Sequence, residues 1–75
     1  MKVTIYGKPM CAACNTAKAD LKAKGIPYEY KELGKDYSIV DFYEIAPRSH
    51  KTFPMIAVDG EYVGSYNDYL TKHSN

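Results

Sequence analysis

The sequence predicts an α/β fold in which a four-stranded mixed sheet is flanked by three helices, in the order β-α-β-α-β-β-α. Three observations support this prediction. Runs rich in β-branched and aromatic residues alternate with segments that have the apolar spacing of amphipathic helices. A crossover of helical length separates the first two strands and makes them parallel, whereas an Asp-Gly pair makes the last two strands a hairpin. Seventy-five residues allow a single domain over residues 1–75.

The first strand and helix are marked by composition and by spacing. Residues 2–6 are mostly β-branched or aromatic and favour a strand, which Gly-Lys-Pro at residues 7–9 ends. A helix is expected over residues 11–24, and its apolar stripe at i, i+3 and i+7 is Cys14, Ala17 and Leu21. Gly25 suits the left-handed position after this helix, where Ile26 can pack back on its last turn.

The middle of the chain predicts a second strand and a second helix. The strand covers residues 28–33 and is expected to place Tyr28 and Tyr30 on one face. Ser38 and Asp41 have the spacing of a capping box at the start of the helix. The apolar face of this helix is expected to be Ile39, Phe42, Tyr43 and Ala46. Pro47 ends it, because the residue before a proline avoids the helical region.

The last third of the chain predicts a hairpin and a short helix. Residues 55–58 form a strand, Asp59-Gly60 is the turn, and residues 61–64 return as the fourth strand. Ser65 or Asn67 is expected to cap the final helix. The apolar positions of that helix are Tyr66, Tyr69 and Leu70. Residues 73–75 are expected to fray.

The charge balance argues against two classes of partner. Ten Lys and Arg residues oppose nine Asp and Glu residues, which gives a formal net charge of +1. We therefore expect no nucleic-acid or anionic-membrane partner. No apolar run approaches the roughly 20 residues of a membrane-spanning helix. The first residues form no apolar signal core, so the chain is expected to stay in the cytoplasm, a reducing compartment.

The two cysteines, Cys11 and Cys14, form a C-x-x-C pair. A disulfide that closes so short a loop removes little chain entropy, so the pair is expected to be chemical or metal-binding. Structural zinc needs four ligands, and only His50 and His73 remain to supply them. These histidines fall in a predicted loop and a predicted tail, where we expect both to be solvated. A redox site is favoured over a zinc site, because the pair opens a helix after a strand.

Position in the predicted helix gives the two thiols different tasks. Cys11 falls at the first turn, where unpaired N–H groups and the helix dipole favour the thiolate, so its pKa is expected to be lowered. Cys14 lies one turn later on the apolar stripe and is expected to be more buried. Cys11 would attack a target disulfide, and Cys14 would then attack Cys11 and release the reduced target.

Over nearly its whole length the sequence resembles the small glutaredoxins, which have a minimal thioredoxin fold. The segments that carry the resemblance, in this order and spacing, are residues 3–6, 8–14, 51–54 and 64–68. The resemblance implies a dithiol–disulfide oxidoreductase that reduces protein disulfides or mixed disulfides with glutathione. In that family Cys11 would be the nucleophile and Cys14 the resolving thiol.

The resemblance also assigns a substrate site. Pro54 matches a cis-proline that faces the active site, and the backbone of Phe53 would meet the substrate as a strand-like edge. Lys8 and Lys51 match positions near the glycine carboxylate of glutathione. The full set of implied contact residues is Lys8, Lys51, Thr52, Phe53, Pro54, Ser65, Asn67 and Asp68. Three positions depart from the usual family pattern: Ala13 replaces an aromatic residue, Phe53 a smaller aliphatic one and Asn67 an aspartate.

The resemblance further implies partners. We expect a monomer with no bound cofactor, in which glutathione acts as co-substrate. The alternative electron donor is a flavoprotein disulfide reductase of the thioredoxin-reductase type. Ribonucleotide reductase is the target associated with the smallest members, which suggests a role in deoxyribonucleotide synthesis. An iron–sulfur cluster module is less favoured, since most dedicated carriers have one thiol. An arsenate-reductase relative is also disfavoured, since 75 residues leave no space for its long helical insertion.

Overall fold

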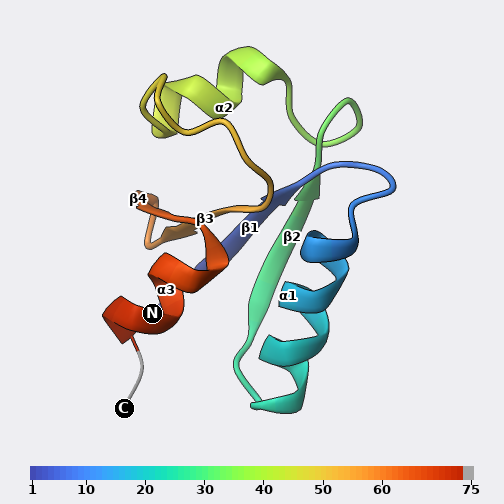
Figure 1. Cartoon of the computed structure of the whole chain (residues 1–75), viewed down its shortest axis with the longest axis vertical. Helices are drawn as coiled ribbons and strands as arrows, with labels where there is room; N and C mark the ends of the chain where they lie inside the picture. The colour runs from blue at the N-terminus through green and yellow to red at the C-terminus, as the bar shows by residue number, and fades with distance from the viewer. Residues whose placement is uncertain (74–75) are drawn as a thin grey trace.

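The computed structural model describes residues 1–73 and has the predicted order of elements (Figure 1). The elements are β1 (Val3–Gly7), α1 (Ala12–Ala23), β2 (Tyr28–Glu32), α2 (Ile39–Ile45), β3 (Met55–Val58), β4 (Glu61–Gly64) and α3 (Tyr66–His73). The strands form one mixed sheet in the order β2-β1-β3-β4, which confirms the predicted fold class. His73 belongs to α3, and the predicted fraying of residues 74–75 lies outside the described residues.

The central strands bury both of their faces. β1 pairs in parallel with β2 and antiparallel with β3, and β3 pairs antiparallel with β4. Because side chains alternate along a strand, β1 and β3 each place side chains in two separate cores, one on either face of the sheet. One core lies under α1 and α3 and contains Val3, Ile5, Ile56 and Val58. The other lies under α2 and contains Tyr6, Met55, Ala57 and Phe42. Figure 1 shows α2 set apart from α1 and α3.

Helix α1 is held by its apolar stripe and ended by a glycine motif. The stripe residues Cys14, Ala17 and Leu21 are all fully buried, as the spacing predicts. Gly25 has a φ of 72°. The N–H of Ile26 donates to the carbonyl of Leu21 at 3.0 Å, and the N–H of Gly25 donates to Lys22 at 3.1 Å. This pair of hydrogen bonds forms a Schellman motif, with Gly25 in the left-handed position that the sequence predicts.

Helix α2 confirms its predicted cap and, except for Ile39, its predicted apolar face, because Phe42, Tyr43 and Ala46 belong to the core under this helix. The Ser38 hydroxyl accepts from the N–H of Asp41, and the Asp41 carboxylate accepts from the N–H of Ser38. Phe42 is buried, but Ile39 is 48% exposed, so its assignment to the core was wrong. The helix has only seven residues and packs chiefly through Phe42. Tyr37, which precedes the helix, is buried against the Tyr6 ring instead.

The hairpin and the start of α3 follow the sequence signals. Asp59 and Gly60 have φ angles of 53° and 83°, as a primed two-residue turn requires. Ser65 is the cap of α3, because its hydroxyl accepts from the N–H of Asp68 at 3.2 Å. Gly64 has a φ of 135°, and a Cβ there would lie 2.9 Å from the Cβ of Asp68, so this tight turn requires glycine. No helix within residues 1–73 has the length and apolar character to cross a membrane.

Candidate active site

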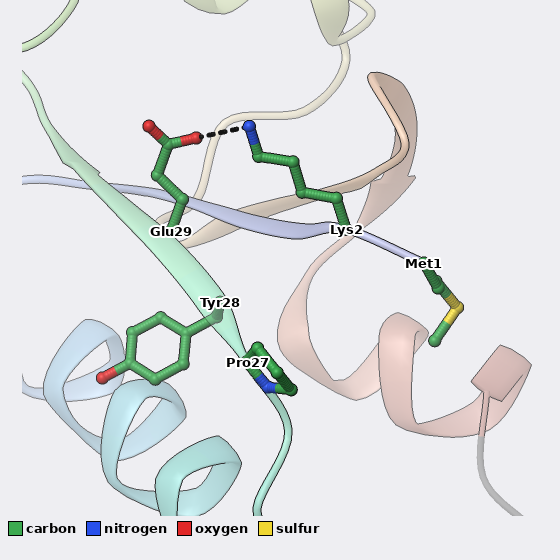
Figure 2. Close-up of a pocket in the computed structure, with 5 residues that line it drawn as sticks. All are labelled: Met1, Lys2, Pro27, Tyr28 and Glu29. Atoms are coloured by element: carbon green, nitrogen blue, oxygen red, sulfur yellow. Dashed lines mark ion pairs between the residues drawn. The ribbon is translucent and has the colours of Figure 1, made fainter.

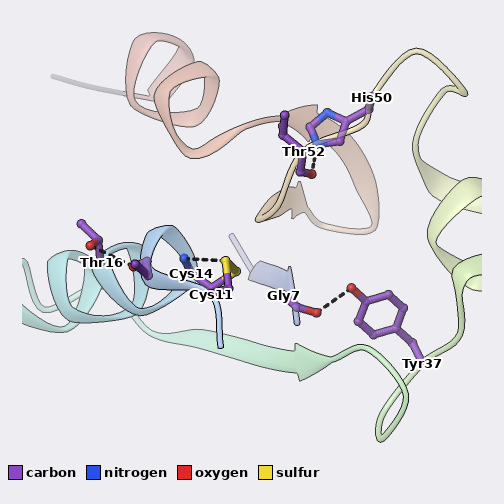
Figure 3. Close-up of a disulfide and its surroundings, with 8 residues drawn as sticks. Gly7, Cys11, Cys14, Thr16, Tyr37, His50 and Thr52 are labelled. Carbon is purple, nitrogen blue, oxygen red and sulfur yellow. Dashed lines mark hydrogen bonds between the residues drawn. A yellow bond between two sulfur atoms is a disulfide. The ribbon is translucent and has the colours of Figure 1, made fainter. Parts of the chain in front are cut away.

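The two cysteines lie at the N-terminus of α1 and are joined as a disulfide (Figure 3). Their Cα atoms are 5.3 Å apart. Cys11 is the N-cap of the helix, one position before the first turn in which the sequence places it. Its extended backbone (φ −116°, ψ 105°) lets the side chain fold over the exposed amides of that turn.

The surroundings of the two sulfurs differ as the sequence predicts. The N–H of Cys14 donates to the Sγ of Cys11 at 3.2 Å. Cys11 retains 8% of its surface, whereas Cys14 is fully buried. The first turn of α1 contains no acidic residue, so no carboxylate offsets the positive end of the helix dipole. The site can therefore favour negative charge on the Cys11 sulfur and shield the Cys14 sulfur from solvent.

The loop at residues 52–54, here called the proline loop, precedes β3 and lines a groove together with Ala13, a residue between the two cysteines. The Phe53–Pro54 peptide bond is cis, as the resemblance implies, and Pro54 is buried. The half-buried Phe53 ring packs against Phe42 at a centroid distance of 5.1 Å. The Nζ of Lys8 lies 5.3 Å from the Phe53 ring centroid, so the loop after β1 meets the proline loop here.

An open groove of about 370 Å³ brings together α1, the proline loop and the start of α3. Its lining residues are Ala13, Thr16, Phe53, Pro54, Ser65, Tyr66 and Asn67. Four of the predicted contact residues are among them, namely Phe53, Pro54, Ser65 and Asn67. The others, Lys8, Lys51, Thr52 and Asp68, are exposed residues outside its lining. The groove adjoins the C-x-x-C pair through Ala13, which lies between the two cysteines in sequence.

Asp68 takes part in the N-terminal cap of α3. Its carboxylate accepts from the N–H of Ser65 at 2.9 Å and from the Ser65 hydroxyl at 3.1 Å. These hydrogen bonds hold the pKa of Asp68 below its ordinary value. Asp68 therefore stabilises the helix start that forms one end of the groove.

Sequence reasoning did not identify Thr16 and Tyr66 as groove residues, because it assigned Tyr66 only to core packing. Tyr66 is partly packed on the core, but its hydroxyl also donates to the Asp20 carboxylate on α1. This hydrogen bond and the ion pair of Asp20 with Lys24, at 3.1 Å, lower the pKa of Asp20. Burial and the Asp20 contacts raise the pKa of Tyr66. The contact ties α3 to α1 beside the groove.

His50 is buried, contrary to the expectation that it is solvated. Its Nδ1 lies 2.7 Å from the Tyr62 hydroxyl, and its Nε2 lies 2.8 Å from the Thr52 carbonyl. The loop folds back on β4, and this long-range contact removes the imidazole from water. Within residues 1–73 no three His, Cys, Asp or Glu side chains are grouped to hold a metal ion.

A second pocket lies where β1 begins, at the end of the strand remote from the cysteines (Figure 2). It is lined by Met1, Lys2, Pro27, Tyr28 and Glu29. The side chains of Lys2 and Glu29 form an ion pair at 3.2 Å but are 70% and 46% exposed. Such surface pairs contribute little free energy, and this pocket contains neither of the two cysteines.

Comparison with known proteins agrees with this geometry. A family model described as Glutaredoxin matches residues 3–63. Glutaredoxin 3 of Escherichia coli K12 is 36% identical over 67 residues, which cover 88% of this chain and 78% of that protein. The solved structure of reduced E. coli glutaredoxin matches with a TM-score of 0.74 and 25% identity, covering 97% of this chain and 96% of that chain.

A longer relative contains a similar segment. Hybrid peroxiredoxin hyPrx5 of Haemophilus influenzae is 33% identical over 66 residues, which cover 88% of this chain. The matched region is 27% of that protein, so the chain spans little more than a quarter of its length.

Proposed function

Because the chain belongs to the glutaredoxin family and is a thiol–disulfide oxidoreductase, we propose that it carries electrons from glutathione to disulfides. The proposed substrates are protein disulfides and mixed disulfides of proteins with glutathione. The observation that carries this proposal is the Cys11–Cys14 pair at the start of α1, which adjoins a groove formed by the proline loop and α3.

The proposed reaction starts from the dithiol form. The Cys11 thiolate attacks one sulfur of the target disulfide, a bond forms between the two sulfurs, and the other target sulfur leaves as a thiolate. Cys14 loses its proton and attacks the Cys11 sulfur, so that the second target thiolate leaves. The target gains two electrons and two protons, and the protein is left with the Cys11–Cys14 disulfide that this structure contains.

Glutathione is proposed to lie in the groove as co-substrate, with no resident cofactor. Its cysteine sulfur would face Cys11, and its backbone would lie along Phe53 and Pro54. Lys8, whose Nζ lies over the Phe53 ring, and Lys51, two positions before Phe53, would attract its glycine carboxylate, with Thr52 between Lys51 and Phe53 in sequence. Its γ-glutamyl end would meet the start of α3, where Ser65, Asn67 and Asp68 lie.

The electron donor can be tested directly. Two coupled assays would follow NADPH oxidation with a mixed-disulfide substrate, one with glutathione and glutathione reductase and one with thioredoxin reductase. We expect turnover with glutathione. Turnover with thioredoxin reductase alone would overturn the glutathione proposal and favour the alternative donor. The alternative is kept because Ala12 and Ala13, between the two cysteines, resemble the redoxins that flavoproteins reduce.

Ribonucleotide reductase is the proposed protein target, in cytoplasmic deoxyribonucleotide synthesis by a monomeric protein. The support is the resemblance to the smallest glutaredoxins. Reduced protein should sustain ribonucleotide reduction by the oxidised reductase, and the Cys11→Ser variant should not. A wild-type protein that fails in this assay while reducing other protein disulfides would exclude this target.

A further inference from the structure

His50 anchors the connection between α2 and β3, defined here as residues 47–54. Within residues 1–73, four hydrogen bonds hold this connection in place, and His50 takes part in all four. Its N–H donates to Pro47 at 2.9 Å, and its carbonyl accepts from the Tyr43 hydroxyl at 2.9 Å. Its ring supplies the other two, to Tyr62 and to Thr52.

The partners of the ring define its tautomer. A carbonyl oxygen can only accept, so the Nε2 of neutral His50 must carry the proton that it donates to Thr52. The Tyr62 hydroxyl then donates to Nδ1. The ring also packs against Phe42 and Tyr62, at centroid distances of 5.8 Å and 5.5 Å. The imidazole is therefore held between α2 and β4 in one orientation.

The Thr52 carbonyl belongs to the same peptide unit as the N–H of Phe53. That unit is trans, because the cis bond of this region is the next one, Phe53–Pro54. In a planar trans peptide the C=O and N–H bonds point in opposite directions. By holding the carbonyl of Thr52 toward its ring (Figure 3), His50 turns the N–H of Phe53 away from the ring. Within residues 1–73 this N–H has no hydrogen-bond partner.

We propose that His50 is a positioning residue that aims the unpaired N–H of Phe53 at a backbone carbonyl of the substrate. This inference rests on the proposed function in one respect, namely that the Phe53 edge of the groove receives the substrate chain. A leucine could fill the space of the imidazole but could not donate to Thr52. The peptide unit would then be free to rotate, and the substrate would lose an oriented donor.

Single-turnover kinetics with stoichiometric reduced protein test this inference without an electron donor. Two substrates are compared: a peptide carrying a mixed disulfide with glutathione, and bis(2-hydroxyethyl) disulfide, which has no amide. For His50→Leu we expect the second-order rate constant for the peptide to fall about ten-fold, chiefly through a higher half-saturation concentration. The rate with the small disulfide should stay within about two-fold of wild type.

Three further variants make the test specific. His50→Gln can donate to Thr52 and accept from Tyr62, so it should restore the peptide rate to within about three-fold of wild type. His50→Asn is too short to reach Thr52 and should behave like His50→Leu, so it replaces that variant if leucine prevents folding. His73→Leu makes the same exchange at the exposed histidine of α3 and should change neither rate.

Several results would overturn the inference. They are an unchanged peptide rate in a folded His50→Leu or His50→Asn variant, an equal loss with both disulfides, or no recovery in His50→Gln. A wild-type protein that shows no preference for the peptide over the small disulfide would also overturn it. Failure of glutathione as donor would leave it standing, because this assay contains no donor.

Discussion

Replacing Tyr37 by phenylalanine removes one buried hydrogen bond at the start of the active-site loop. The Tyr37 hydroxyl donates to the carbonyl of Gly7 at 2.7 Å, across 30 positions of sequence (Figure 3). Gly7 is the last residue of β1, four positions before Cys11. The ring itself would stay, packed edge-on against Tyr6 at a centroid distance of 5.1 Å.

The structure limits the size of the effect. The carbonyl of Gly7 also accepts from the N–H of Leu33 at 2.9 Å, so it keeps one partner in the variant. The loss is therefore that of one ordinary hydrogen bond, about 1 kcal/mol, with no cavity of side-chain size. For a domain of this length, that corresponds to a melting temperature lower by about 4–8 °C.

The same substitution should alter the response to alkali. Burial raises the pKa of Tyr37 above its ordinary value, so the folded protein retains this proton after the unfolded chain has lost it. The unfolded state then binds fewer protons, and the free energy of unfolding falls as pH rises above about 10. Tyr37→Phe removes this contribution, so its stability should fall less steeply over that range.

Urea unfolding at neutral and alkaline pH measures both effects, with Tyr28→Phe as control. The Tyr28 hydroxyl has no hydrogen-bond partner within residues 1–73, so its loss should leave stability nearly unchanged. Equal stability of Tyr37→Phe and Tyr28→Phe would refute the contact with Gly7. A loss above about 3 kcal/mol would mean that the ring had lost its packing as well.

Other variants test the cysteine pair, the cap of α3 and its turn. Cys14→Ser should trap Cys11 in a mixed disulfide that mass spectrometry detects; release of the target at the wild-type rate would contradict the proposed roles. The lowered pKa of the Asp68 carboxyl stabilises the fold above about pH 4, and this contribution is lost as the pH falls. In Asp68→Asn the free energy of unfolding should therefore decrease less steeply toward acid pH than in the wild type, and an equal decrease in both would contradict this. Gly64→Ala should lower the free energy of unfolding by at least about 1 kcal/mol, and by more than Gly34→Ala, because Gly34 also has a positive φ but has open space around it. Equal losses in the two variants would contradict the clash with Asp68.

The elements of the fold were predictable because their signals are local. The Asp59-Gly60 turn, the Gly25 helix end and the Ser38 cap each depend on residues close in sequence, and all three are present. The burial of single side chains in and near α2 was harder to predict from the sequence. Ile39 matches the helical period, but a seven-residue helix buries chiefly one side chain, and that side chain is Phe42.

The candidate site divides in the same way. The spacing and position of Cys11 and Cys14 identify the redox pair without a structure. The groove residue Tyr66 depends on how α3 packs against α1, 46 positions away at Asp20. His50 was misplaced for the same reason: its partner Tyr62 lies 12 positions away on β4, and no local pattern marks that contact.

The pH dependence of Cys11 alkylation in the reduced protein tests the central claim most directly. Iodoacetamide reacts with the thiolate, and mass spectrometry shows which sulfur carries the label. Because Cys11 caps α1 and its sulfur accepts the N–H of Cys14, we expect half-maximal reactivity below the roughly 8.5 of an ordinary thiol, with the label on Cys11. Half-maximal reactivity at or above that value, or first labelling of Cys14, would contradict the account.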